Sequence, residues 1–194
     1  MKYLSFFVSI CMFLTVNLYA KNYTVIQRTI VNKNFSKEEK LHFIKSLLKQ
    51  EDNKKEINFI DKHGYTALDL AVIHNYPSIV ETLLENGANP NIKDKKGYTP
   101  LHRAVIKLSP KLTQLLMEYK ADPDIKDIYG YTALERAFLY EDVDLAYTIG
   151  EILLKNGANP FVTDKRGRTL FEKLASEKGE RKKLLELLIK YMNK

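Results

Sequence analysis

Residues 94–104 of this chain read DKKGYTPLHRA, and the same pattern occurs three more times. Residues 61–71 read DKHGYTALDLA, residues 127–137 read DIYGYTALERA, and residues 164–174 read DKRGRTLFEKL. The aspartates that open these copies are 33, 33 and 37 residues apart. Self-similarity at a fixed period of this length is typical of repeat architectures, in which each copy is one supersecondary unit that packs against the next. The sequence therefore predicts a stack of similar units.

Each copy carries the signals of a tight turn followed by a helix. An aspartate three residues before a glycine is typical of a turn in which glycine supplies a positive φ and aspartate bonds the local backbone. The threonine two residues after the glycine is the predicted N-cap of a helix, and Pro100 suits the first helical position. Glu135 and Glu172 lie three residues after their threonines and complete capping boxes. His102 stands at the same place, so we expect a capping role for it.

A second helix is predicted in each copy. It begins near Pro77 and Pro110, carries an apolar stripe, and ends at Gly87 or Gly157 in the left-handed conformation. Lys120 replaces that glycine in the middle copy, where we expect the turn to be strained or to change shape. The third copy is longer by four residues, which we place within residues 140–146 as an extended helix with a bulged loop between the two helices.

The period and the segment Thr99–Ala104 resemble the ankyrin repeat, and the resemblance covers roughly residues 57–180. It implies an all-α ankyrin-repeat solenoid, built of helix-turn-helix repeats with β-turn fingers and capped at both ends. The amphipathic segment Lys37–Lys49 is the expected N-terminal capping helix, and Lys182–Tyr191 is the expected second helix of the C-terminal cap. The expected domains are an N-terminal segment at 21–56 and repeats over 57–194, divided at about 61–93, 94–126, 127–163 and a capping repeat at 164–194.

The first twenty residues predict a secretory signal peptide. Lys2 precedes an apolar run over residues 4–16, and Ala20 is a small residue at the expected cleavage point. The run is shorter than the roughly 20 apolar residues of a spanning helix, although an uncleaved anchor is the alternative. Cleavage would start the mature chain near Lys21 with no stable membrane span, and would remove Cys11, the only cysteine. We expect the exported chain in the periplasm, with an extracellular location as the alternative.

The sequence offers little for catalysis or metal binding. A single cysteine excludes a disulfide scaffold and a structural thiolate site. His42, His63 and His74 have no partner at metal-ligand spacing, and no glycine-rich phosphate loop or nucleophile motif occurs. We therefore predict no enzyme activity, no catalytic or metal site and no cofactor. The net charge of +7 points only weakly to anionic partners, and export argues against nucleic acid.

One recurrent position goes beyond what the scaffold needs. The residue after each turn glycine is Tyr65, Tyr98 and Tyr131, and then Arg168 in the fourth copy. The family resemblance implies that these positions and the finger residues before each glycine contact partners. The remaining candidates for the partner-binding site are cationic or aromatic finger residues, namely Lys95, Lys96, Tyr129, Lys165 and Arg166. The alternative is that the tyrosines pack on one another for stability, and the sequence leaves both interpretations open.

The sequence therefore favours an exported, non-catalytic module that binds a protein through the concave face and fingers of an ankyrin stack. The partner is unknown, and the cationic fingers suggest an acidic one. One alternative is an accessory protein in the cell envelope that handles haem or assists a haem enzyme such as catalase. In it, a tyrosine phenolate would bind ferric iron and the cations would pair with the propionates. Another alternative is an envelope immunity or inhibitor protein.

Overall fold

The fold is mainly helical, as the sequence predicts. The computed structural model describes residues 23–164, 166–176 and 179–193, and within these ranges it contains no strand and only one isolated bridge, between Thr163 and Thr169. The helices are α2 (Val25–Val31), α3 (Lys37–Leu47), α4 (Glu51–Lys55), α5 (Ala67–Ile73), α6 (Pro77–Glu85), α7 (Pro100–Ile106), α8 (Pro110–Glu118), α9 (Ala133–Ala137), α10 (Val143–Lys155), α11 (Leu170–Ala175), the 3₁₀ turn η1 (Gly179–Arg181) and α12 (Lys182–Met192).

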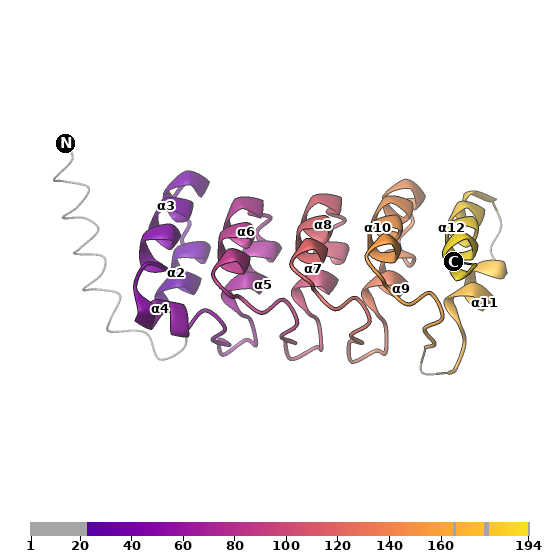
Figure 1. The fold of residues 1–194 in the computed structure, drawn as a ribbon, viewed down its shortest axis with the longest axis horizontal. Coiled ribbons are helices and arrows are strands. Elements are labelled where there is room, and N and C mark those ends of the chain that lie inside the picture. Colours follow the sequence, from indigo (N-terminus) through magenta and orange to yellow (C-terminus); the bar gives the residue numbers. More distant parts are fainter. Residues whose placement is uncertain (1–22, 165, 177–178, 194) are drawn as a thin grey trace.

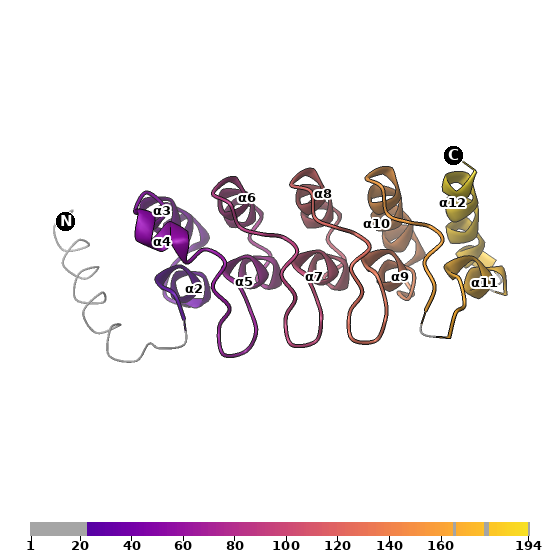
Figure 2. The same ribbon diagram turned by 60° about the horizontal axis from the view of Figure 1, so that its bottom comes forward.

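The helices stand in pairs along a row (Figure 1). The first helices of successive pairs contact one another from α2 through α5 and α7 to α9, and the second helices do so from α3 through α6, α8 and α10 to α12. The loops that carry the aspartate–glycine turns extend together from one edge of the row, next to the first helices (Figure 2). We call these loops the fingers. Each pair therefore buries its apolar stripes against its own partner helix and against the neighbouring pair.

Equivalent leucines form the centre of this continuous core. Leu68, Leu101 and Leu134 occupy the same place in three copies, and each is at most 1% exposed. Burying a leucine side chain contributes about 1.5–3 kcal/mol. The fourth copy has Phe171 at this place, and that side chain is only partly buried.

The predicted capping boxes are confirmed. The hydroxyl oxygens of Thr66, Thr99, Thr132 and Thr169 each accept the backbone N–H three residues later, and the side chain at that third position bonds back to the threonine N–H. His102 takes part like the acids of the other copies, as predicted. Such caps contribute about 0.5–2 kcal/mol each and fix where every first helix begins.

The turn at Lys120 keeps the shape of its glycine equivalents. Gly87 and Gly157 have φ values of 91° and 93°, and Lys120 adopts 58° at the corresponding place. The middle copy therefore holds a side chain in the left-handed region, at a cost of roughly 1 kcal/mol, and the turn is strained without being reshaped.

The extended helix predicted in the third copy is confirmed, and the loop before it is also longer than its equivalent. Helix α10 begins at Val143, in register with Pro110 where α8 begins, but α9 ends early at Ala137. The loop between α9 and α10 therefore covers residues 138–142, where the loop between α7 and α8 covers 107–109. The four extra residues lie inside α10, which has 13 residues where α8 has 9. At this point Gly150 admits the ring of Phe138, since a Cβ on Gly150 would lie too close to that ring.

The N-terminal end contains more structure than the sequence predicted. Helix α3 ends two residues earlier than expected, and a further helix, α2, precedes it. Thr24 caps α2 in a capping box with Gln27, and Tyr23 stands directly before Thr24 as Tyr65 stands before Thr66. The pair α2–α3 therefore has the layout of the helices of a further copy. Among the described residues, no helix combines the length and apolar character of a membrane span, and residues 1–20 of the predicted signal peptide lie outside the described range.

Candidate functional site

The fingers are held by their aspartates. Asp94 Oδ1 accepts the backbone N–H groups of Lys96 at 2.7 Å and Tyr98 at 2.9 Å, and the aspartates of the other three fingers repeat this pattern. Neighbouring fingers also meet, because Ile128 N–H donates to Lys96 O at 3.2 Å. The fingers thus form a connected edge that presents the side chains of Lys95 and Lys96 to solvent.

The recurrent tyrosines alternate with cations from the first helices. The guanidinium of Arg103 lies 4.5 Å from the ring centroid of Tyr65 and 5.8 Å from that of Tyr98. Arg136 lies 5.4 Å from the ring of Tyr98 and 4.9 Å from that of Tyr131. Lys173 Nζ then lies 5.3 Å from the Tyr131 ring. We call this series the tyrosine–cation ladder; its members are Tyr65, Arg103, Tyr98, Arg136, Tyr131 and Lys173.

Buried carboxylates hold the ladder cations in place. Arg136 pairs with Asp127 at 2.6 Å, and Arg103 pairs with Asp94 of its own finger. Arg103 also reaches back to Asp69 in the preceding copy, with 3.4 Å between Nε and Oδ1. Each of these cations therefore joins its own finger to the tyrosine or acid of the copy before it.

Lys173 repeats the arrangement in the last copy. Its ammonium lies 3.2 Å from Asp164 of its own finger and 3.2 Å from Glu135 of the preceding copy. Cation–π contacts contribute about 0.5–2 kcal/mol each, and the partly buried ion pairs add to them. The ladder thus gives the tyrosines a structural role, through interleaved cations rather than through the ring-on-ring packing that the sequence suggested.

Burial and charge shift the pKa values of three groups along the ladder. Burial raises the pKa of Asp69 to about 6, against the hydrogen bonds from Thr66 and the charge of Arg103. Burial also lowers the pKa of His102, and this effect is larger than the opposite effect of the hydrogen bond between its ring and the Tyr131 carbonyl. Desolvation acts to raise the pKa of Asp164, but the N–H groups of its turn and the Lys173 ammonium outweigh it and hold that pKa well below its usual range.

His102 is consequently a neutral connector between copies. Its Nδ1 accepts the Thr99 N–H at 3.3 Å, so the proton is on Nε2, which donates to Tyr131 O at 3.1 Å. Gln27 makes the equivalent connection at the N-terminal end, where its side-chain amide donates a hydrogen bond to the backbone oxygen of Tyr65 in the next copy at 2.9 Å. Both ring nitrogens of His102 form hydrogen bonds with backbone groups, so neither is available to a substrate.

The remaining predicted site residues lie at the finger tips. Tyr129 is 52% exposed, and Arg166 and Arg168 are also exposed, the latter paired with Asp164 at 3.1 Å. Lys165 lies outside the described residues. Lys95, Lys96 and Tyr129 belong to neighbouring fingers and share the solvent-facing edge, whereas the ladder tyrosines lie deeper and are half-buried.

Sequence reasoning missed two apolar residues beside the ladder. Ile106 and Leu139 occupy equivalent positions in two copies and are 37% and 53% exposed. Ile106 is the last residue of α7 and lies three residues after Arg103 on the same helix face, whereas Leu139 lies in the turn two residues after the end of α9. The two residues are 33 positions apart, one repeat period, and this spacing could have identified them as equivalent apolar positions. Tyr23 was missed as well, although the Tyr–Thr dipeptide pointed to it.

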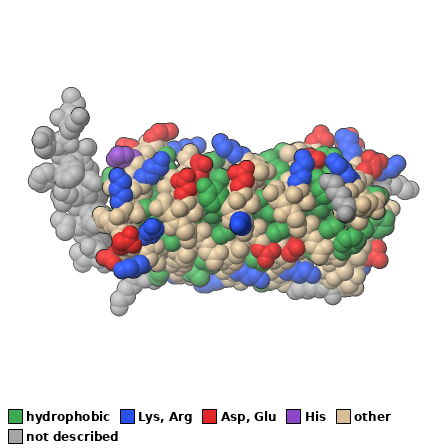
Figure 3. All heavy atoms as spheres, viewed as in Figure 1, with side chains coloured by type: hydrophobic (Ala, Val, Ile, Leu, Met, Phe, Trp, Pro, Cys, Tyr) green, Lys and Arg blue, Asp and Glu red, His purple; other side chains and the backbone are tan. Residues whose placement is uncertain are grey.

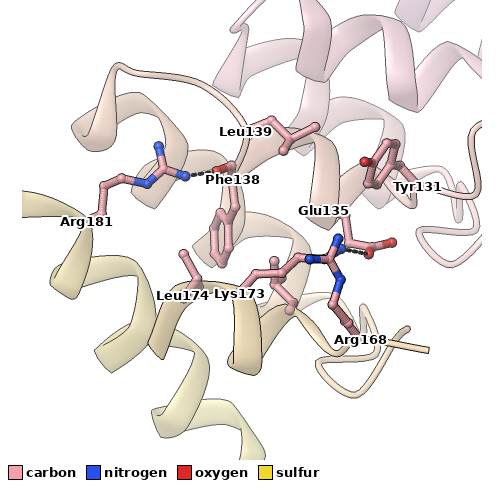
Figure 4. Close-up of a pocket in the computed structure, with 9 residues that line it drawn as sticks. Tyr131, Glu135, Phe138, Leu139, Arg168, Lys173, Leu174 and Arg181 are labelled. Atoms are coloured by element: carbon pink, nitrogen blue, oxygen red, sulfur yellow. Dashed lines mark hydrogen bonds and ion pairs between the residues drawn. The ribbon is translucent and has the colours of Figure 1, made fainter. Parts of the chain in front are cut away.

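A pocket of about 240 Å³ opens between α9 and α11, at the last step of the ladder. Its buried wall consists of Phe138, Leu170 and Leu174, and Leu139 stands at its edge. The other lining residues carry polar or charged groups, namely Tyr131, Glu135, Arg168, Lys173 and Arg181. Figure 4 shows Tyr131, Glu135 and Lys173 on one side of this pocket and Arg181 on the other.

The described part of the chain contains no cluster of three or more His, Cys, Asp or Glu side chains that could hold a metal ion. The ladder acids are paired with cations, and His102 is bonded at both nitrogens. What the arrangement offers is a surface: exposed cations and aromatics on a connected finger edge, with apolar side chains and a pocket beside it.

A family model for ankyrin repeats matches residues 52–104 and 83–137. Residues 52–137 are therefore similar to ankyrin repeats. The matched residues include α5 to α9 and the fingers that hold Tyr65, Tyr98 and Tyr131, whereas the last copy lies beyond them. A search of curated proteins found no match. Ankyrin repeats are in general non-catalytic modules for protein–protein interaction, and the described helices of this chain fit such a module.

Proposed function

We propose that this protein is an exported, non-catalytic module that binds another protein on the ladder side of its ankyrin repeats. The observation that carries the proposal is the exposed apolar pair of Ile106 and Leu139 next to the ladder. Large apolar side chains that recur on one face of a folded domain mark interaction surfaces more often than scattered ones do.

The finger edge adds the features of an interface rim. Ile128 and Tyr129 are about half exposed at the tip of one finger, next to the finger that carries Lys95 and Lys96. Tyrosine supplies a large rigid contact, and rim cations steer association with an acidic surface. The opposite, second-helix side shows basic and acidic side chains interspersed (Figure 3), so charge alone favours no site there.

The export part of the proposal rests on the first twenty residues. A short basic start, an apolar run and Ala20 form a signal peptide pattern, which supports periplasmic placement after cleavage near Lys21. N-terminal sequencing of the protein from the envelope fraction is expected to begin at or near Lys21; a sequence that begins at Met1 would reject cleavage.

The described residues give no support to the haem-handling or the immunity alternative. Small-molecule sites have volumes of roughly 300–1,000 Å³. The pocket between α9 and α11 has about 240 Å³ and would hold one side chain rather than a macrocycle. The phenol rings of the ladder lie between cations that bind them to neighbouring copies. No observation on the described residues favours inhibition of a toxin over other protein binding.

Site-specific crosslinking in the producing cell tests the binding face. A photo-reactive amino acid at Leu139 is expected to give a defined crosslink to a second protein, and the same group at Lys111 is the control. Lys111 is exposed on α8, a second helix away from the ladder. Equal crosslinking from both positions, or none from Leu139, would contradict the proposed surface.

A further inference from the structure

The ladder stops one ring short at its C-terminal end. Arg103 and Arg136 each contact the tyrosine of the preceding copy and the tyrosine of their own copy. Lys173 contacts Tyr131 of the preceding copy in the same way. The place of the next ring belongs to Arg168, because that residue follows the turn glycine where the other fingers have tyrosine.

The pocket lies at this interrupted step. Both Arg168 and Lys173 line it, together with Tyr131, so the last ring of the ladder and its last cation face the same space. The Arg168 side chain is 56% exposed, unlike the half-buried tyrosines, and leaves part of that space open. Phe138, Leu170 and Leu174 supply an apolar wall. A planar apolar group in the pocket would extend the alternation of rings and cations by one step.

Charge decides what surrounds that group. Arg168, Lys173 and Arg181 line the pocket beside the carboxylate of Glu135, which is paired with Lys173. Asp164 forms ion pairs with both Arg168 and Lys173. Of these two cations Arg168 is the more exposed, with 56% of its side chain accessible against 21% for Lys173. A carboxylate beside the inserted ring would therefore meet the exposed guanidinium of Arg168 at the rim of the pocket.

We propose that this pocket takes an aromatic side chain from an acidic segment of the partner protein, so that the partner's ring completes the tyrosine–cation ladder and a neighbouring carboxylate pairs with Arg168. The inference rests on the proposed function and names the chemistry of the partner. A single ring agrees with a volume of about 240 Å³. Aromatic anchors in pockets are typical hot spots of protein interfaces.

The first test uses the blocked tripeptide Glu-Tyr-Glu as the probe, with binding to the isotope-labelled protein followed by NMR. Saturable shifts are expected at Tyr131, Leu139 and Lys173. The peptides Glu-Ala-Glu and Lys-Tyr-Lys are expected to bind at least tenfold more weakly. Equal binding of Glu-Ala-Glu, or shifts scattered away from the pocket, would overturn the assignment.

Two variants separate ring from charge. Arg168→Tyr supplies the missing ring from within, so it should weaken the Glu-Tyr-Glu probe at least tenfold and raise the melting temperature. Arg166→Tyr, the same change two residues away on an exposed position outside the pocket, is the matched control and should bind as before. Arg168→Ala keeps the pocket but should erase the preference for Glu-Tyr-Glu over Gln-Tyr-Gln. An Arg168→Tyr variant that binds the probe unchanged would contradict the proposal.

The outcomes keep this inference apart from the proposed function. If Leu139 crosslinks to a protein while Glu-Tyr-Glu fails to bind, the pocket assignment is wrong and the binding face stands. If the probe binds the pocket as described while Leu139 gives no crosslink, the pocket assignment stands and the proposed face is wrong.

Discussion

At the residue scale, the ladder depends on charges that are only partly exposed. Arg136 places its guanidinium between the rings of Tyr98 and Tyr131 while bonding the buried carboxylate of Asp127. An isolated surface ion pair contributes little to stability, but a buried carboxylate that loses its cation costs more, because its charge is then uncompensated. The ladder positions should therefore behave unlike the cations of the finger tips.

The first prediction compares a ladder cation with a finger cation. Arg136→Met should lower the free energy of unfolding by about 1–3 kcal/mol, because it leaves Asp127 without its cation and removes the contacts with the rings of Tyr98, Tyr129 and Tyr131. Lys96→Met at an exposed finger position should change it by less than about 0.5 kcal/mol. Urea denaturation of both variants measures the difference, and equal midpoints would argue against the ladder.

The second prediction concerns pH. In the unfolded chain His102 gains a proton near its usual pKa of about 6.5, whereas burial lowers its pKa in the folded chain. The stability contributed by neutral His102 is therefore complete above pH about 6.5 and is lost as the pH falls below it. Asp69 acts in the opposite direction: its raised pKa of about 6 makes acidification between pH about 6 and 4 stabilising.

The variant His102→Gln isolates the histidine, since both chains keep Asp69. A glutamine can make the same connection, as Gln27 does in the first pair. Relative to the parent, the variant should gain stability between pH 7 and 5, measured by denaturation at each pH. A difference that stays constant over this range would contradict a depressed pKa for His102.

At the element scale, the fingers differ in how closely they approach their neighbours. A Cβ on Gly97 would lie 2.9 Å from Ile128 N of the next finger, whereas a Cβ on Gly167 would meet nothing within 4 Å. Both glycines have positive φ, 70° and 75°. The two positions therefore share the backbone requirement and differ only in the contact between fingers.

The third prediction uses this matched pair. Gly167→Ala should cost roughly 1 kcal/mol for the left-handed backbone. Gly97→Ala should cost roughly 1–3 kcal/mol more, because the finger that begins at Asp127 must also shift. Thermal unfolding of the two variants provides the measurement. If Gly97→Ala were no worse than Gly167→Ala, the fingers would not be in contact.

The sequence predicts these elements well wherever local chemistry decides them. Caps, turn glycines and helix starts depend on neighbouring residues, and Thr66, Thr99 and Pro110 stand where the pattern places them. The position of the four extra residues of the third copy could be predicted only approximately, because a helix can absorb one turn without disturbing its apolar face.

The candidate site was less predictable than the fold. Spacing identified Tyr98 and its equivalents, but it could not show that cations from the helices lie between the rings, since this needs the distance between copies. In the sequence Leu139 resembles any core residue of a helix, but it lies in the turn after α9 and is exposed there. The pocket depends on side chains from α9, α11 and η1 together.

At the scale of the whole molecule, both rows of helices build the core, and one side of the stack also presents a surface. The first helices and the second helices each pack against their equivalents in the next copy, while the side that carries the fingers presents the ladder, Ile106 and Leu139. A stack held by contacts between neighbours has a long rigid surface and no need for a closed active-site cavity. We propose that this surface binds a protein through its exposed apolar residues, while the ladder beneath it provides stability.

The most direct test measures stability and partner binding in the same two variants, once crosslinking at Leu139 has supplied the partner. Leu139→Ala should weaken partner binding by about 1–3 kcal/mol and leave the melting temperature nearly unchanged, because its side chain is 53% exposed. Tyr98→Ala should lower the melting temperature, because its ring contacts two ladder cations. A Leu139→Ala variant that binds the partner as tightly as the parent would contradict the account.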